Sequence, residues 1–183
     1  MARTILAEHS PTPIRDVRDG EVVKIVGRVA ARDEVLIAPV SRHRCVAYYV
    51  FAEARYATTR NKGWAPAIRE RQIVAPIVVD DTGRAFVEVD DVEVVVVKDV
   101  HRDVGAGADP HVDALMRAHG RDPHKVRLRE GSIDVGERVA IVGLARWRVD
   151  LVAHGYRGRS EVLELVAPPE HPLILSDDPE TFG

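Results

Sequence analysis

The one cysteine of the chain, Cys45, is a candidate nucleophile. It follows Arg42, His43 and Arg44, and positively charged neighbours lower the pKa of a thiol and favour its reactive thiolate. However, Cys45 also opens the apolar run 45–52, where a free cysteine usually packs as a small buried hydrophobe. We therefore expect Cys45 to pack in the core, and we keep a thiol-dependent enzyme that uses Cys45 as one alternative function.

Pairs of arginines separated by one residue form a second chemical pattern. In a β-strand such pairs point to the same face of the sheet, and the apolar residue between them points to the core. The pairs are Arg69 and Arg71, Arg127 and Arg129, and Arg146 and Arg148. If these faces adjoin, they form an arginine-rich patch on which Tyr49, Phe51 and Trp147 are candidate platforms for stacked bases. A patch that faces a protein or a lipid is therefore one alternative and single-stranded nucleic-acid binding is another, although a solvated face is the simpler interpretation.

The sequence lacks the motifs of metal and cofactor sites. None of the eight histidines lies four residues from another, which is the spacing of a helical metal site. Carboxylates cluster at Asp80 and Asp81 and again in residues 88–93, where they suit a hairpin turn and a solvated loop. We find no phosphate-binding glycine loop and no nucleophile elbow. We expect no metal, no cofactor and no catalytic residue.

The composition is that of a globular protein with room for one sizeable core. The chain has 183 residues, of which 45% are hydrophobic and 30% are charged. The formal net charge of −3 excludes a strongly basic footprint for nucleic acid over the whole chain. A single cysteine excludes an intramolecular disulfide and fits a cytoplasmic location. No apolar stretch approaches the roughly 18–20 residues that span a bilayer.

Short runs of β-branched residues between turn residues predict a mainly β protein. The clearest hairpin reverses at residues 80–83, between two valine-rich runs. A helix is predicted over residues 108–120, because Asp109 suits the N-cap and Pro110 suits the first turn. We predict a small OB-like β-barrel, closed or partly open, with this one α-helix inserted and an extra hairpin from residues 45–74.

Residues 20–27 and residues 136–143 are similar, with six of eight positions identical. Each copy begins as a turn, continues as an apolar strand and ends in a glycine, Gly27 or Gly143. These two glycines suit bends at which strands curl to close a barrel. Two similar strands of one barrel are the simpler interpretation, and duplication of half a domain is the alternative.

Several short blocks of sequence also follow one another in a recognisable order. They are residues 20–29, 36–41 and 45–49, then Trp64, then residues 76–83, 130–143 and 172–176. In this order they resemble the GIDE domain, also called the BAM domain. This domain occurs in the mitochondrial outer-membrane ubiquitin ligase family and in many bacterial proteins. The resemblance covers roughly residues 12–178.

The resemblance implies a recognition module that binds a protein or another ligand, and it transfers no catalytic residue. Family members commonly carry flanking membrane helices, and the ligases add a C-terminal RING. A RING needs several zinc ligands, which a chain with one cysteine does not supply, so we expect no ligase activity. We expect no transmembrane segment in this chain, and peripheral association with a membrane if it is a piece of a longer protein.

The predicted organisation has three parts: an extended lead-in over residues 1–19, a single barrel domain over residues 20–178, and a tail over residues 179–183. The function predicted first is non-catalytic recognition of a protein partner, followed by nucleic-acid binding and then by thiol chemistry. The partner is expected to use strand faces and the loops around residues 42–44 and Trp64. The candidate binding residues are Arg42, His43, Arg44, Trp64, Arg127, Arg129, Arg146 and Arg148.

Overall fold

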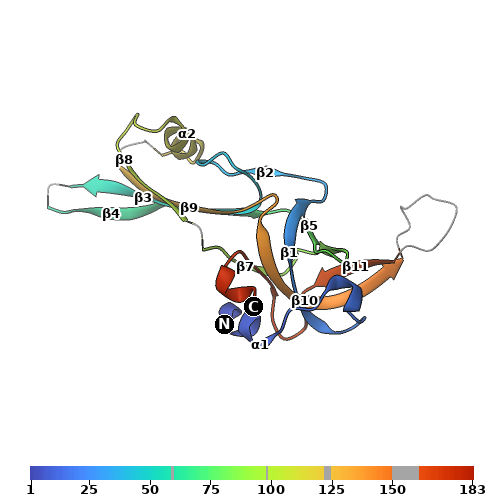
Figure 1. The fold of residues 1–183 in the computed structure, drawn as a ribbon. Helices are drawn as coiled ribbons and strands as arrows, with labels where there is room; N and C mark the ends of the chain where they lie inside the picture. Colours follow the sequence, from blue (N-terminus) through green and yellow to red (C-terminus); the bar gives the residue numbers. More distant parts are fainter. Residues whose placement is uncertain (59, 98, 122–124, 150–160) are drawn as a thin grey trace.

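Five strands close into a barrel in the computed structural model, which describes residues 1–183 except 59, 98, 122–124 and 150–160 (Figure 1). The strands are β1 (Val22–Ala31), β5 (Pro76–Val79), β6 (Arg84–Val87), β10 (Arg138–Val149) and β11 (Glu161–Val166). Their order around the barrel is β1-β5-β6-β11-β10, and antiparallel pairing of β10 with β1 closes the ring. The predicted small OB-like barrel is therefore confirmed.

The two similar segments, residues 20–27 and 136–143, belong to the neighbouring strands β1 and β10. The strands run antiparallel with Ile25 opposite Ile141, so equivalent positions of the two copies lie symmetrically about this pair. Gly20 donates a backbone hydrogen bond to Ala145 at 2.9 Å at one end, and its counterpart Gly136 donates one to Val29 at 2.7 Å at the other. The similarity therefore marks two equivalent strands of one barrel.

The last glycine of each segment lies where its strand changes partner. One residue after Gly27, at Arg28, β1 passes from pairing with β10 to pairing with β5. One residue after Gly143, at Leu144, β10 passes from pairing with β1 to pairing with β11. A Cβ atom on Gly27 would lie only 2.5 Å from the carbonyl oxygen of Val79 on β5. The glycine is needed because the neighbouring backbone occupies the space of a side chain.

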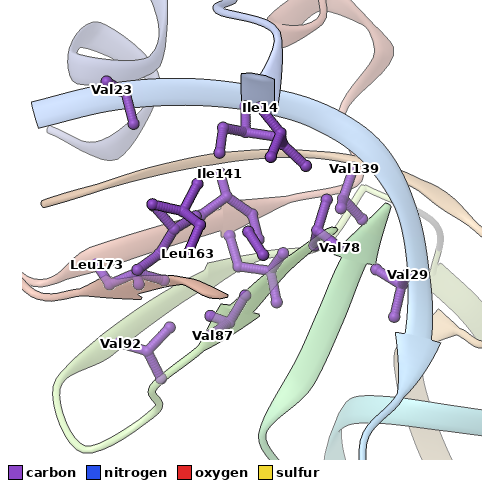
Figure 2. Close-up of a cluster of buried hydrophobic side chains, with 14 of the residues drawn as sticks. Ile14, Val23, Val29, Val78, Val87, Val92, Val139, Ile141, Leu163 and Leu173 are labelled. Atoms are coloured by element: carbon purple, nitrogen blue, oxygen red, sulfur yellow. The ribbon is translucent and has the colours of Figure 1, made fainter. Parts of the chain in front are cut away.

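Branched aliphatic side chains fill the barrel (Figure 2). Alternate residues of each strand point inward, so the strands contribute side chains such as Val29, Val78, Val87, Ile141 and Leu163, all nearly or fully buried. Burial of one such side chain stabilises the fold by roughly 1.5–3 kcal/mol. The valine-rich runs of the sequence thus form one continuous apolar core.

A second sheet is inserted into the barrel at two places. Between β1 and β5 the chain forms β2 (Leu36–Ile37), β3 (Arg44–Ala57) and β4 (Lys62–Ile73). Between β6 and β10 it adds β8 (Asp99–Val104) and β9 (Val126–Asp134). β3 is central, because it pairs with β4 and with β9, and β9 pairs in turn with β8. The extra hairpin predicted from the sequence is β3–β4, and it is part of this larger sheet.

The helix α2 (Pro110–Ala118) is the inserted helix predicted from the sequence, and it covers one face of the second sheet (Figure 1). The carboxylate of Asp109 caps it by accepting hydrogen bonds from the backbone N–H groups of His111 and Val112. Val112 and Met116 are fully buried against strand residues that include Leu128. One face of the sheet is therefore closed by an amphipathic helix.

The N-terminal residues differ from the extended lead-in predicted for residues 1–19. Ala2–Glu8 form the helix α1, in which Ala2 and Leu6 are one turn apart and pack on the outside of the barrel. A segment of seven residues is too short for a helical period to be recognised in a sequence. No helix in the described part of the chain is long and apolar enough to cross a membrane.

The barrel sheet continues beyond β10 through two short strands. β12 (Leu173–Ser176) pairs antiparallel with β10, and β7 (Val92–Val95) pairs parallel with β12. The C-terminal tail begins with a 3-10 turn, Pro179–Thr181, which lies beside α1. The tail is thus packed against the barrel and helps α1 to cover its outer surface.

Candidate functional site

Arginines from two of the three predicted pairs come together on one face of the second sheet, which we call the open face. Its members are Tyr49, Phe51 and Glu53 of β3, Trp64, Arg69 and Arg71 of β4, His101 and Asp103 of β8, and Arg127 and Arg129 of β9. Phe51 lies directly between Arg69 and Arg129 in the strand register. The structure therefore joins residues that are as much as 80 positions apart in the chain.

The open face follows from the alternation of side chains along its strands. Val50, Ile68 and Leu128 are buried on the side that α2 covers. Their sequence neighbours point to the opposite side, because successive side chains of a strand alternate between faces. The apolar residues thus fix which face is packed, and the arginines are left exposed on the other.

Two aromatic rings of the open face carry arginine side chains. The Arg127 guanidinium lies 4.0 Å from the centroid of the Trp64 ring, and the Arg69 guanidinium lies 5.7 Å from that of Phe51. An exposed contact of this kind contributes about 0.5–1 kcal/mol. The rings are half-buried and the arginines are exposed, so each ring supports a guanidinium from below.

A shallow groove of about 390 Å³ runs across the open face. The open-face residues that line it are Phe51, Glu53, His101, Asp103, Arg127 and Arg129. Arg127 Nε lies 3.8 Å from Asp103 Oδ2, and both side chains are about half exposed. Exposed ion pairs of this kind contribute roughly 0–1 kcal/mol, so Arg127 can exchange Asp103 for another carboxylate at little cost.

Arg42, His43 and Arg44 are exposed at the end of β3 that is remote from Trp64. Arg44 begins β3, whereas Trp64 pairs with Arg55 near its other end. At about 3.3 Å per residue, these two ends of β3 are roughly 30 Å or more apart. The structure therefore does not bring the two predicted loops into one site.

A buried carboxylate fixes the backbone just before this arginine-rich loop. Glu130 of β9 is 1% exposed, and its two oxygens accept hydrogen bonds from the backbone N–H groups of Val40 and Ser41, each at 2.7 Å. His43 Nδ1 lies 3.0 Å from Asp134 Oδ2 at the surface. Glu130 of β9 therefore holds the backbone of this loop in a defined shape. Its position in the sequence does not indicate this role.

Arg146 and Arg148 belong to β10 of the barrel and lie apart from the open face. Arg148 Nε is 2.6 Å from Glu164 Oε2, and both arginines line a hollow of about 450 Å³ that also contains three further carboxylates. Trp147 between them is half-buried, and its indole N–H donates a hydrogen bond of 3.0 Å to the Val17 carbonyl. This pair therefore stands in an acidic setting, and Trp147 is not an open stacking platform.

Cys45 is fully buried, which confirms the packing expected for it. Its Sγ lies 3.8 Å from the carbonyl oxygen of Leu36. Burial, together with the negative charges of Asp134 and Glu130, raises the pKa of the thiol to about 11. The three preceding basic residues do not reverse this effect, so the thiol is protonated at neutral pH. Burial and the raised pKa therefore disfavour Cys45 as a nucleophile.

A hydrogen-bonded group that sequence spacing did not reveal lies beside the C-terminal end of α2. Tyr48 donates its hydroxyl hydrogen bond to Glu70, and His119 Nε2 lies 2.8 Å from the other Glu70 oxygen. The hydrogen bond from Tyr48, helped by His119, holds the pKa of Glu70 below its ordinary value despite partial burial. The group joins β3, β4 and the end of α2, so it stabilises the packed side of the sheet.

Metal-ligating residues are dispersed over the described part of the chain. No group of three or more histidine, cysteine, aspartate or glutamate side chains in the described ranges has an arrangement that could hold a metal ion.

We compared the chain with protein-family models, with curated proteins and with solved structures, and none of the three comparisons gives a match.

Proposed function

We propose that this chain is a non-catalytic, GIDE-like interaction module that recognises a protein partner. The observation that carries this proposal is the open face, on which exposed arginines lie over half-buried aromatic rings. Arginine and aromatic residues are enriched at the centres of protein interfaces and dominate their binding energy. A sheet that is packed by a helix on one side and carries such residues on the other is suited to bind another molecule.

The barrel supports this proposal by holding the second sheet rigidly. Val46 and Ala47 of β3 and Ile133 of β9 are buried in the same apolar cluster as the barrel residues. The second sheet is therefore anchored in the barrel core at the base of two of its strands. A surface that is preorganised in this way loses less conformational entropy when it binds.

The proposal is tested by isolating a partner and reconstituting the complex. The full chain is used as affinity bait in an extract of its source organism, with an unrelated tagged protein as control. Each candidate is then purified and titrated against the chain by calorimetry. We expect saturable binding of at least one purified protein. Failure of every purified candidate to bind, or substrate turnover that one point substitution abolishes, would contradict the proposal.

Single-stranded nucleic acid is the second candidate ligand, favoured by the OB-like barrel together with the basic aromatic face. The face formed by β5 and β6, where such barrels usually bind oligonucleotides, has one half-buried aromatic residue, Phe86, with Arg32 and Arg84 over its ring. Arg32 is already paired there with Glu88 at 3.0 Å. The Glu88 carboxylate would repel a phosphate beside this arginine, which weakens the case for a phosphate site on the barrel itself.

The nucleic-acid candidate has a simple test. A labelled oligothymidine is titrated with the chain at several salt concentrations. If this candidate is correct, the affinity falls steeply as salt rises, because phosphate contacts release counterions. Absence of binding at low salt removes the candidate.

A further inference from the structure

The geometry of the open face specifies the chemistry of its ligand. Arg69 and Arg129 lie on either side of Phe51, on the two strands that flank β3. Strands in a sheet are about 4.8 Å apart, so the Cα atoms of these two arginines are roughly 10 Å apart. This row presents one positive charge on each side of the apolar Phe51 ring.

The arginines are oriented by the rings beneath them. A guanidinium that stacks on an aromatic ring keeps its in-plane N–H groups for other partners, and these match the two oxygens of a carboxylate. The Arg127 guanidinium lies 4.0 Å from the centroid of the Trp64 ring, and the Arg69 guanidinium lies 5.7 Å from that of Phe51, so each is placed over a ring. Because the side chains are already positioned, they lose little rotamer freedom when a carboxylate arrives.

The spacing along β9 matches an extended polypeptide. Arg127 and Arg129 are two residues apart on the same face of one strand, which places them roughly 6.6 Å apart. Alternate side chains of an extended segment have the same repeat. A segment that lies along β9 can therefore direct its alternate carboxylates to both arginines.

The open face is less suited to a nucleic acid. The rings of Phe51 and Trp64 are occupied by arginines of the chain itself, whereas base stacking needs an accessible ring. Glu53 and Asp103 line the same groove as Arg127 and would repel a backbone that carries a phosphate at every nucleotide. A polypeptide can instead place one carboxylate at Arg127, where it takes the place of Asp103 in the exposed ion pair, and uncharged residues over Glu53.

We propose that the open face binds an extended acidic segment of the partner protein, with alternate carboxylates paired to Arg127 and Arg129 and a further carboxylate paired to Arg69. This inference rests on the proposed function and names the kind of segment recognised.

The test uses a labelled peptide of about eight alternating glutamate and serine residues, which spans roughly 26 Å when extended. A glutamine–serine peptide and an oligothymidine serve as comparison ligands. The full chain is compared with R69E/R129E and with the control R18E/R121E, which makes the same charge change at exposed arginines outside the open face. A third variant, R69K/R129K, keeps the charges but removes the planar guanidinium groups.

We expect the acidic peptide to bind the wild-type chain and the control variant equally, and the glutamine peptide to bind neither. R69E/R129E should lose about tenfold or more in affinity, because it replaces two attractive charges by two repulsive ones. R69K/R129K should lose less, because lysine keeps the positive charge and loses only the paired hydrogen bonds of the guanidinium. If R69E/R129E does not fold, the loss measured in R69K/R129K decides the question.

Three results would overturn the inference. The first is that the acidic peptide does not bind the wild-type chain, and the second is that R69E/R129E and R69K/R129K bind this peptide as tightly as the wild-type chain does. The third is that the wild-type chain prefers oligothymidine and that R69E/R129E abolishes this binding. A purified partner that binds R69E/R129E as tightly as wild type also overturns it but leaves the proposed function intact. The absence of any purified partner contradicts the proposed function itself.

Discussion

Replacement of Gly27 by alanine should weaken the closure of the barrel. A Cβ atom at this position would lie 2.5 Å from the carbonyl oxygen of Val79 and 2.8 Å from Val78 Cγ1. Ordinary contacts of a Cβ atom begin near 3.4 Å, so β1 and β5 would have to move apart by up to about 0.9 Å. The obstacle is backbone rather than the end of a flexible side chain, so it cannot rotate away.

The expected effect is large for a single methyl group. Overpacking costs about 1–3 kcal/mol, and we expect G27A near the upper value because the strand hydrogen bonds beside the glycine are strained as well. For a domain of this size, about 3 kcal/mol corresponds to a fall in Tm of roughly 6–12 °C. The symmetric glycine is less crowded, since a Cβ on Gly143 would lie 3.1 Å from Val166 O. We expect G143A to cost about 1 kcal/mol.

The assay is thermal and denaturant unfolding of the full chain, followed by circular dichroism. G105A is the matched control, because a Cβ atom on Gly105 would meet nothing within 4 Å. We expect G27A to be the least stable, G143A to be intermediate, and G105A to equal or slightly exceed wild type. A Tm for G27A within about 2 °C of wild type would refute the argument that close backbone approach requires this glycine.

Three further predictions concern buried or hydrogen-bonded groups. Because its pKa is raised from 9.0 to about 11, Cys45 should be alkylated about 100-fold more slowly in the folded than in the unfolded chain at neutral pH, and equal rates would contradict this. E70Q should cost about 1–2 kcal/mol at pH 7 through its weakened bonds to Tyr48 and His119. Since the folded pKa of Glu70 is lowered, this difference should shrink as pH falls through and below 4.5 in denaturant titrations, and a constant difference would argue against it. D80A should lower the free energy of unfolding by about 2 kcal/mol and D80N by less, because the Asp80 carboxylate accepts hydrogen bonds from backbone N–H groups of its own turn and of the N-terminal segment. Equal unfolding curves for D80A, D80N and the wild-type chain would rule this out.

The barrel was predictable because its signals are local. Runs of valine and isoleucine mark the strands, the polar turn at residues 80–83 marks the hairpin, and Asp109 with Pro110 marks the start of α2. Gly27 and Gly143, each at the end of an apolar run, indicate bends from their place in the sequence. β8 was not predicted, because its charged residues interrupt the apolar pattern on which a strand is recognised.

The candidate site was predictable only in part because it depends on strand pairing. Two-residue spacing correctly indicated that Arg127 and Arg129 share a face. It could not show that Arg69 joins them across β3 whereas Arg146 lies on the barrel, since register between distant strands is set by the whole fold. Burial likewise decided the state of Cys45, and burial is a property of the packed chain.

The two tryptophans provide the most direct test that the open face is the recognition surface. The indole N–H signals of Trp64 and Trp147 can be followed by NMR while the acidic peptide is added to the 15N-labelled full chain. Trp64 lies under Arg127 on the open face, whereas Trp147 is on β10 of the barrel and donates its N–H hydrogen bond to Val17 of the N-terminal segment. We predict a saturable shift of the Trp64 signal and an unchanged Trp147 signal. A shift of Trp147 alone, or of neither, would contradict the account.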